Sequence, residues 1–572
     1  MNRGRSVQVL LLAPAMALLG AFFIMPIGGF LLQGFTASDG RLTLVHADRM
    51  WTAGTYAQVM WTSVKISFWV TLLSVLVGYP AAYVIATADK RSKGYWALFV
   101  LLPFWSSFLV RTFAWIVLLG RQGPVNTTLW SWGFDRADLL YTWGAVIVGM
   151  ANVLVPFAIL TMVGVMEKVD RSLVAAAGTL GARPVQAFFC VYLPLSMPGV
   201  TAAAILVFIT ALGFFIAPAL LGSARETMIT QLIIQQVIEL ANWPFAAILC
   251  WLLLSCALLI FLVFDRLFGL SALAGEARAA TGGLIARIGR QGVRLSSAVG
   301  DGLARLAELL HWPAPVSPDV ANRTRFAAAL VILFLIAPLL LLIPVSFSGR
   351  PFLSWPPTDI GLGWYREALT SPVWLAATMR SFAVAFLTAL ICFLVATPAA
   401  FAFLRLSGRS ASAVFALMIS PLLVPRVVIA VALFWVYAKL GLVGTIAGLV
   451  IGHAVIALPF FFIAVIAVLK TYDQRLDLAA ASLGASPLQT ARRVTLPLIA
   501  GGLTSAALFA FVVSLDELNI ALFASGGLQS TLPKLMWDEA TLRFSPLLAA
   551  VSTLVLLLMS SVVLVAARLR NT

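Results

Sequence analysis

The chain has 572 residues, of which 62% are hydrophobic and only 10% are charged, and its mean hydropathy is +1.02. A soluble domain carries about a quarter charged residues, so this composition excludes a soluble globular protein. The net charge of +16 is scattered among apolar stretches, which favours a membrane-topology signal over a nucleic-acid surface.

The apolar stretches predict an all-α membrane protein with twelve transmembrane helices, because a spanning helix needs about 20 mostly apolar residues. The predicted spans of the first half are 7–33, 62–88, 95–119, 141–166, 198–221 and 245–264. Those of the second half are 327–348, 380–404, 411–438, 442–469, 500–524 and 546–567.

The placement of Lys and Arg predicts that both termini are cytoplasmic. With the N-terminus inside, the inner segments hold 24 of the 38 basic residues, as the positive-inside rule expects. These inner segments are 1–6, 89–94, 167–197, 265–326, 405–410, 470–499 and 568–572. Six spans per half make the two halves parallel rather than inverted, and parallel repeats commonly form a transport path at their interface.

We predict a first half at 1–267, a linker at 268–326 and a second half at 327–572. The linker alternates apolar residues with arginines, which indicates one or two amphipathic helices on the inner membrane surface; a simple tether is the alternative. The cysteines and histidines show no metal-ligand or outer-loop disulfide spacing, so no metal site is expected. They are Cys190, Cys250, Cys256, Cys392, His46, His311 and His453.

One polar-flanked segment occurs twice, at 169–194 and again at 472–497, at an offset of 303 residues. A second match, at an offset of 318, joins 77–83 to 395–401 and Pro103 to Pro421. The matching residues of the first pair are Asp170 and Asp473, Leu173 and Leu476, Ala176–Ala177 and Ala479–Ala480, Leu180–Ala182 and Leu483–Ala485, Pro184 and Pro487, Gln186 and Gln489, and Leu193–Pro194 and Leu496–Pro497.

Each copy predicts a short helix, a tight turn and a second helix. Asp170 and Asp473 are suited to cap the first helix by accepting backbone N–H bonds. Gly181 and Gly484 are suited to end it in the left-handed conformation. Two such segments in the cytoplasm predict two equivalent docking sites for a partner.

With these residues in place, the chain resembles the permeases of ATP-binding-cassette (ABC) importers. Their signature loop reads Glu-Ala-Ala, three residues, Gly, nine residues, Ile-x-Leu-Pro. The chain keeps this spacing in both copies, with Ala175 and Leu478 in place of the Glu. The corresponding residues are Ala175, Ala176, Ala177, Gly181, Ala182, Leu193 and Pro194, then Leu478, Ala479, Ala480, Gly484, Ala485, Leu496 and Pro497.

A finer resemblance links 210–247 to the first permease of spermidine/putrescine-type importers, and 514–534 to the second. It implies a type I importer permease fold with both permeases fused. It also implies an amine-containing solute: a polyamine, an omega-amino acid or an aminoalkylphosphonate. Fused ferric-iron and thiamine permeases are alternatives, and Phe214 stands where a polyamine-type first permease can carry an acid.

The resemblance implies that the chain lies in the bacterial inner membrane and has two partners: a homodimeric cytoplasmic ABC ATPase and a periplasmic or lipid-anchored solute-binding protein. No Gly precedes any lysine, so the chain has no phosphate-binding loop, and ATP and Mg belong to the partner ATPase. Rival classes are a twelve-span secondary transporter, which has no need for repeated docking loops, and a membrane enzyme, which lacks a clustered catalytic site.

Intramembrane charges are expected to face a cavity or a partner, because lipid exposure costs several kcal/mol. Asp516 and Glu517 are predicted to lie within span eleven, where they either meet a cationic group of the solute or pair with an arginine inside the protein. The substrate-path candidates are Asp516, Glu517, Phe214, Trp243, Arg111 and Arg426.

Overall fold

The computed structural model describes residues 2–37, 39–182, 184–268, 318–526 and 529–571, with four isolated positions between 301 and 310. The regular secondary structure of these residues is helical, apart from a single isolated β-bridge between Thr36 and Leu42. The predicted linker at 268–326 lies mostly outside the described residues, so its amphipathic helix stays a prediction.

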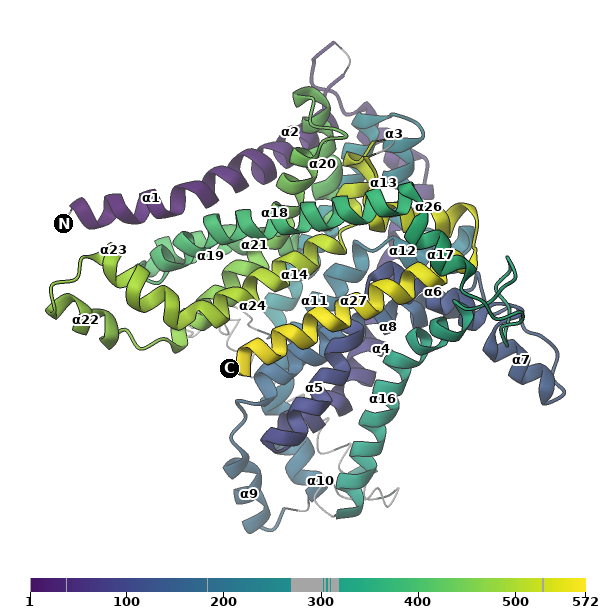
Figure 1. Cartoon of the computed structure of the whole chain (residues 1–572), viewed down its shortest axis with the longest axis horizontal. Helices are drawn as coiled ribbons and strands as arrows, with labels where there is room; N and C mark the ends of the chain where they lie inside the picture. Colours follow the sequence, from purple (N-terminus) through teal and green to yellow (C-terminus); the bar gives the residue numbers. More distant parts are fainter. Residues whose placement is uncertain are drawn as a thin grey trace.

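The first half contains the helices labelled α1 to α14 in Figure 1. They are α1 (Asn2–Leu19), α2 (Met25–Gln33), α3 (Val45–Thr52), α4 (Thr55–Thr87), α5 (Lys90–Trp105), α6 (Phe108–Leu119), α7 (Pro124–Ser131), α8 (Trp143–Met166), α9 (Arg171–Thr179), α10 (Pro184–Ala187), α11 (Leu193–Leu212), α12 (Ile216–Leu221), α13 (Ile229–Ile238) and α14 (Trp243–Phe268).

The second half repeats this order from α16 onward. Its helices are α16 (Pro318–Val345), α17 (Gly363–Thr370), α18 (Pro372–Phe403), α19 (Gly408–Leu423), α20 (Arg426–Leu440), α21 (Ile446–Thr471), α22 (Arg475–Ser482), α23 (Pro487–Thr490), α24 (Leu496–Leu515), α25 (Asn519–Ala524), α26 (Leu532–Leu542) and α27 (Pro546–Asn571).

Most of the predicted spans are confirmed as helices. Among the described residues, nine helices are long and apolar enough to cross a membrane, and two bent pairs raise the number to eleven. The twelfth prediction corresponds to α27, whose apolar part, Pro546–Ser561, is shorter. These helices support a multi-pass membrane protein, as the sequence indicates.

Two spans that the sequence predicts as continuous are broken. The axes of α5 and α6 differ in direction by 89°, and those of α19 and α20 by 95°. Ser106 is extended, and Ser107 starts the new helix by accepting the Leu109 N–H at 3.3 Å. In the second half Pro425 stands at the break, where it lacks an N–H and restricts Val424 to an extended conformation.

Spans five and eleven also end earlier than predicted. The predicted 198–221 divides into the end of α11 and the short α12, and the predicted 500–524 divides into α24 and α25. Asp516 caps the C-terminus of α24, and Glu517 lies in the connection before α25. The prediction that both acids lie inside one helix is therefore wrong: the two acids stand where α24 ends, and the apolar residues on either side of them made the stretch look like one continuous span.

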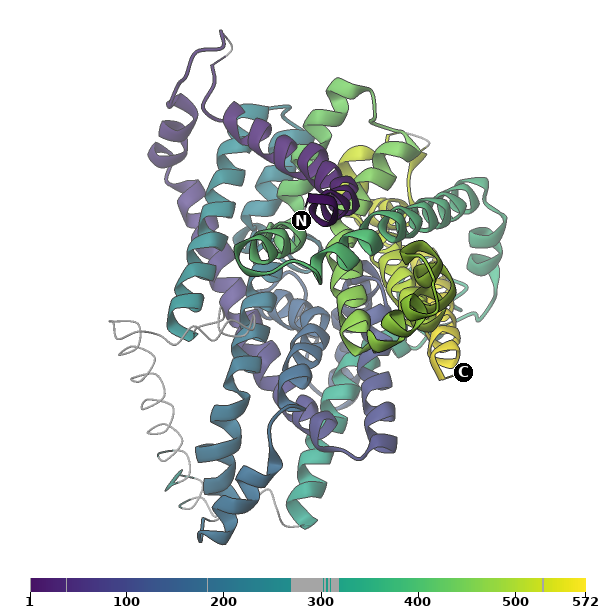
Figure 2. The ribbon, with the colours of Figure 1, turned by 90° about the vertical axis from the view of Figure 1, so that its left-hand side faces the viewer.

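The first span of each half packs against the other half. In Figures 1 and 2, α1 lies along α18, and α16 lies beside α4. Consequently, each of the two hydrophobic cores mixes residues from both halves. Phe30 of α2 belongs to the core built around α18, α20 and α21, whereas Leu335 of α16 belongs to the core built around α4 and α8. The sequence halves are thus interlocked rather than separate bundles.

Candidate functional site

The two copies of the repeated segment begin with a similar hydrogen bond to an aspartate. Asp170 accepts a hydrogen bond from the Ser172 N–H at 2.9 Å, and Asp473 accepts one from the Arg475 N–H at 2.9 Å. The bond from the Ser172 N–H lowers the pKa of Asp170 below its ordinary value of 3.8. The predicted cap is present at Asp170, whereas α22 has Gln474 at its N-cap position, and Asp473, one residue earlier, accepts the first N–H of that helix.

The predicted left-handed glycines are also present in both copies. Gly181 has φ = +87° and Gly484 has φ = +85°. The next residue closes each turn, because the Ala182 N–H donates to the Ala177 carbonyl and the Ala485 N–H donates to the Ala480 carbonyl, at 3.0 and 3.1 Å. These bonds satisfy carbonyls that the end of the helix leaves free.

The second helix of each copy runs without interruption into a membrane span. It contains one π-helical turn, Phe188–Tyr192 in the first copy and Ala491–Thr495 in the second. Each π turn ends just before Leu193–Pro194 or Leu496–Pro497. A proline clashes with the carbonyl four residues earlier in an α-helix, so a wider turn before it accommodates the ring.

Each turn presents a leucine to solvent. The exposed fraction is 88% for Leu180 and 89% for Leu483, at equivalent positions of the two copies. The remaining predicted loop residues lie on α9, α22 and the starts of α11 and α24. The internal repeat aligns these two leucines, but a pattern of matching residues does not show that their side chains are exposed.

The two copies differ in what supports them. In the second, Asp477 accepts hydrogen bonds from Tyr472 Oη at 2.7 Å and Thr495 Oγ1 at 2.8 Å. In the first, aromatic packing takes this place: the Tyr83 ring lies 5.7 Å from Phe188 and 5.0 Å from Tyr192, measured between centroids. One turn geometry is thus held by a polar network in one half and by ring contacts in the other.

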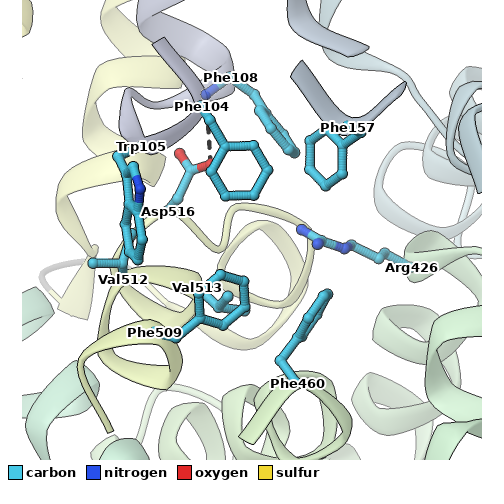
Figure 3. Close-up of a pocket in the computed structure, with 10 residues that line it drawn as sticks. All are labelled: Phe104, Trp105, Phe108, Phe157, Arg426, Phe460, Phe509, Val512, Val513 and Asp516. Atoms are coloured by element: carbon cyan, nitrogen blue, oxygen red, sulfur yellow. Dashed lines mark hydrogen bonds between the residues drawn. The ribbon is translucent and has the colours of Figure 1, made fainter. Parts of the chain in front are cut away.

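A second site lies where the broken spans meet. Asp516, at the end of α24, has its Oδ2 atom 3.5 Å from the Phe108 backbone nitrogen at the start of α6, as Figure 3 shows. This contact joins the second half to the first. The N-terminus of a helix carries partial positive charge and favours a nearby carboxylate.

Glu517 has a different environment from its neighbour. Its side chain is 1% exposed, and its Oε2 lies 3.3 Å from Arg426 Nη1, in an ion pair within the second half. Its other oxygen accepts the Ile520 N–H at 3.3 Å. The alternative of an internal ion pair therefore holds for Glu517 with Arg426, while Asp516 stays half-buried at the wall of a cavity.

Three other substrate-path candidates have different positions. Phe214 lines the cavity and packs 5.7 Å from the Phe108 ring. Arg111 is fully buried and donates to the Val153 and Ser106 carbonyls at 2.9 and 3.3 Å, which fixes the bend between α5 and α6. Trp243 lies at the start of α14 and contacts Phe30 and Phe434. Neither Arg111 nor Trp243 lines the cavity.

The cavity has two lobes that are related by the internal repeat. The smaller lobe is lined by Phe104, Trp105, Phe108, Phe157, Arg426, Phe460, Phe509, Val512, Val513 and Asp516. The larger lobe, of about 280 Å³, shares Phe108, Phe157, Arg426 and Phe460 with it. Its other residues include Leu206, Ile209, Thr210, Gly213 and Leu422, the counterparts of Phe509, Val512, Val513, Asp516 and Phe104.

The lobes therefore have the same backbone framework and different chemistry. The smaller lobe adds a carboxylate and further aromatic rings to the shared residues, whereas the residues that occur only in the larger lobe are mostly aliphatic. No group of three or more His, Cys, Asp or Glu side chains that could hold a metal occurs among the described residues. The arrangement is typical of a binding or translocation cavity.

Two similar halves, interlocked spans and matched exposed loops define the class of a transport permease. The chain belongs to the family described as binding-protein-dependent transport system inner membrane component, which matches residues 78–268 and 393–571. The family occurs twice in the one chain, as expected for a fused permease. It is a transport component rather than an enzyme.

Several known permeases are similar to this chain. The spermidine/putrescine transport system permease protein PotB of Haemophilus influenzae is 38% identical over 212 residues, which cover 36% of this chain and 74% of that protein. PotC of the same organism is 27% identical, covering 39% of this chain and 87% of PotC. The inner membrane ABC transporter permease protein YdcU of Escherichia coli is 30% identical, covering 43% of this chain and 84% of YdcU.

Among solved structures, the chain is similar to a bacterial alginate ABC transporter in complex with an alginate pentasaccharide-bound periplasmic protein. The identity is 19% and the TM-score is 0.41, over 45% of this chain and 92% of that one.

Proposed function

We propose that the chain is the complete membrane pathway of an ATP-driven importer for a small amine-containing solute. Each repeated loop docks in one subunit of a cytoplasmic ATPase dimer, and a solute-binding protein delivers the solute from outside. The observation that carries the proposal is the pair of equivalent turns at Gly181 and Gly484, which expose Leu180 and Leu483.

The loops are suited to transmit movement because each is continuous with a membrane span. The α10 helix and the π turn after it run directly into α11, and α23 runs in the same way into α24. The ends of α11 and α24 reach the cavity through Gly213 and Asp516. A displacement of either loop by a closing ATPase dimer is therefore carried along a helix to the cavity wall.

The small lobe supports an amine as the transported group. Asp516 offers a carboxylate, and Phe104, Trp105 and Phe509 stand around it in Figure 3. Aromatic faces attract an ammonium ion, and the attraction is strongest where water is excluded. The similarity to PotB and PotC supports the same solute chemistry, and leaves a polyamine, an omega-amino acid and an aminoalkylphosphonate as candidates.

The test is assembly with the partner ATPase. Leu180→Asp and Leu483→Asp place a charge at the apolar tip of each loop, and each is expected to reduce co-purification of the ATPase and ATP-dependent uptake. Leu42→Asp is the matched control, because Leu42 is 84% exposed but lies in the segment between α2 and α3. Normal assembly in the Leu180→Asp/Leu483→Asp double variant would contradict the docking role.

A further inference from the structure

We infer that the cavity recognises a zwitterion, in which an ammonium group is joined by a short alkyl chain to a carboxylate or phosphonate. This inference rests on the proposed function and narrows its solute class. Its basis is that the two formally charged side chains lining the cavity within the described residues, Asp516 and Arg426, have opposite signs.

Asp516 supplies the site for the ammonium group. Its carboxylate is half-buried, and Figure 3 shows it beside the Phe104 ring, directed toward the Phe108 backbone N–H at the wall of the cavity. The rings themselves form a continuous wall: Trp105 lies 5.5 Å and Phe460 lies 5.3 Å from Phe509, measured between ring centroids. A carboxylate beside aromatic faces in a water-poor space is suited to a primary ammonium group.

Arg426 supplies the site for the anionic group. Its ion pair with Glu517 is made through Nη1, and its side chain remains 27% exposed toward the cavity. A guanidinium has five N–H donors in a planar fork, so one carboxylate partner leaves donors for a second anion. Figure 3 shows the guanidinium directed into the same space as Asp516, across from Phe108 and Phe157.

Glu517, the acid next to Asp516, does not provide a second site for an ammonium group. Glu517 is 1% exposed and bonded to Arg426 and the Ile520 N–H, so it is not a free acceptor for a second amine. A diamine would therefore bring two positive charges to one available carboxylate and one arginine. Asp516 and Glu517 are balanced by Arg426 and by the buried Arg111, which interacts electrostatically with Asp516. A zwitterion adds no net charge to this set, whereas a diamine adds two uncompensated positive charges, which is costly in a low-dielectric space.

The larger lobe fits the linking chain rather than further charges. Leu206 and Leu422 stand in place of Phe509 and Phe104 of the smaller lobe, and Gly213 stands where the second half has Asp516. Arg426 and Phe108 belong to both lobes. A short alkyl chain is thus accommodated beside the guanidinium, while a long polyamine would place its additional amines against aliphatic side chains.

The experiment measures the binding affinity of ligands that share a chain of four carbon or phosphorus atoms. Binding to the purified full-length chain in lipid nanodiscs is measured by calorimetry. The probes are 4-aminobutyrate, 3-aminopropylphosphonate, butylamine, butyrate and 1,4-diaminobutane. Because a hydrogen bond to a charged group contributes about 1.5–3 kcal/mol, each favoured zwitterion is expected to bind roughly tenfold to a hundredfold more tightly than butylamine. The carboxylate and phosphonate probes show which anionic group is preferred.

Two variants assign the ends of the ligand. Asp516→Asn is expected to weaken the zwitterions and butylamine together. Arg426→Gln combined with Glu517→Gln removes both partners of the ion pair, so no buried charge is left unpaired, and it is expected to remove the advantage of the zwitterions over butylamine. Retention of that advantage in the double variant would overturn the inference.

Binding of 1,4-diaminobutane as tightly as 4-aminobutyrate, or binding of none of the probes, would also overturn it. Co-purification of the partner ATPase is measured in parallel for the unmodified chain and for each variant. If assembly is intact while the zwitterion preference is absent, only the solute class is wrong. If the ATPase fails to assemble with the unmodified chain, the proposed function itself is wrong.

Discussion

The two halves break their membrane spans at equivalent positions and fill the breaks with different chemistry. In the first half, Phe108 and Phe214 pack ring against ring at 5.7 Å. Their counterparts, at offsets of 318 and 303, are Arg426 and Glu517, which form an ion pair at 3.3 Å. The comparison shows that the backbone break does not depend on charge, so the charges of the second half are available for another role.

The largest expected effect comes from removing one partner of that pair. Arg426→Leu leaves Glu517 buried without its cation, and we expect a loss of about 3–5 kcal/mol of stability. The double variant Arg426→Phe/Glu517→Phe copies the aromatic pair of the first half and should recover most of this loss while abolishing solute transport. Thermal unfolding of the detergent-purified variants, followed by uptake, is the measurement. A double variant no more stable than Arg426→Leu would show that the two breaks are not equivalent.

The next largest expected effect is the destabilisation caused by a substitution at Gly213, the counterpart of Asp516. A Cβ atom at Gly213 would lie 3.0 Å from the Pro425 Cβ, so Gly213→Ala is expected to destabilise the protein by about 1–3 kcal/mol through overpacking. Gly164→Ala is the control, because a Cβ there meets nothing within 4 Å. Equal melting temperatures for the two variants would contradict the close approach of α11 and α20.

The repeated loops provide a functional comparison. Gly181→Val and Gly484→Val each force a β-branched residue into the left-handed region, although open space surrounds both glycines. We expect each variant to lower receptor-stimulated ATPase activity in reconstituted membranes, and by different amounts, because Asp477 supports only the second loop. Equal losses of stimulated ATPase activity would contradict the expected difference between the two loops. Unchanged stimulation in both variants would contradict their role in coupling.

The smallest effect is a pH dependence of the first loop. The pKa of Asp170 is lowered in the folded protein by the hydrogen bond from the Ser172 N–H, so its contribution is present above the ordinary value of 3.8 and is lost as the pH falls through the folded pKa. Asp170→Asn keeps a capping oxygen but does not titrate. The protection of the α9 amides, measured by hydrogen exchange relative to the intrinsic rate at each pH, should therefore fall at acidic pH in the unmodified chain and stay constant in Asp170→Asn.

The sequence was sufficient for the features that depend on local chemistry. The cap at Asp170 and the left-handed turns at Gly181 and Gly484 follow from residue types, and the structure confirms them; Asp473 bonds to the first N–H of α22 from one residue before the N-cap. The helical spans follow from apolar length. These features need no knowledge of which segments meet in space.

The remaining features depend on long-range packing. The break before Phe108 lies at Ser106 and Ser107, and two serines within a long apolar stretch do not distinguish a broken span from a continuous one. The packing of α1 against the second half and of α16 against the first half cannot be predicted from the sequence either, because every span is apolar on several faces. The sequence offered a cavity role and an arginine pair for the two acids but did not show which acid takes which. That difference arises because α24 ends at Leu515, so Asp516 lies at its C-cap and Glu517 in the connection to α25.

The central claim is that one chain carries both docking sites for an ATPase dimer. The most direct test is native mass spectrometry of the purified transporter. The account predicts a complex of one chain with two ATPase subunits, which dissociates when Leu180→Asp and Leu483→Asp are combined. A stable complex with a single ATPase subunit, or uptake driven by an ion gradient without ATP, would contradict it.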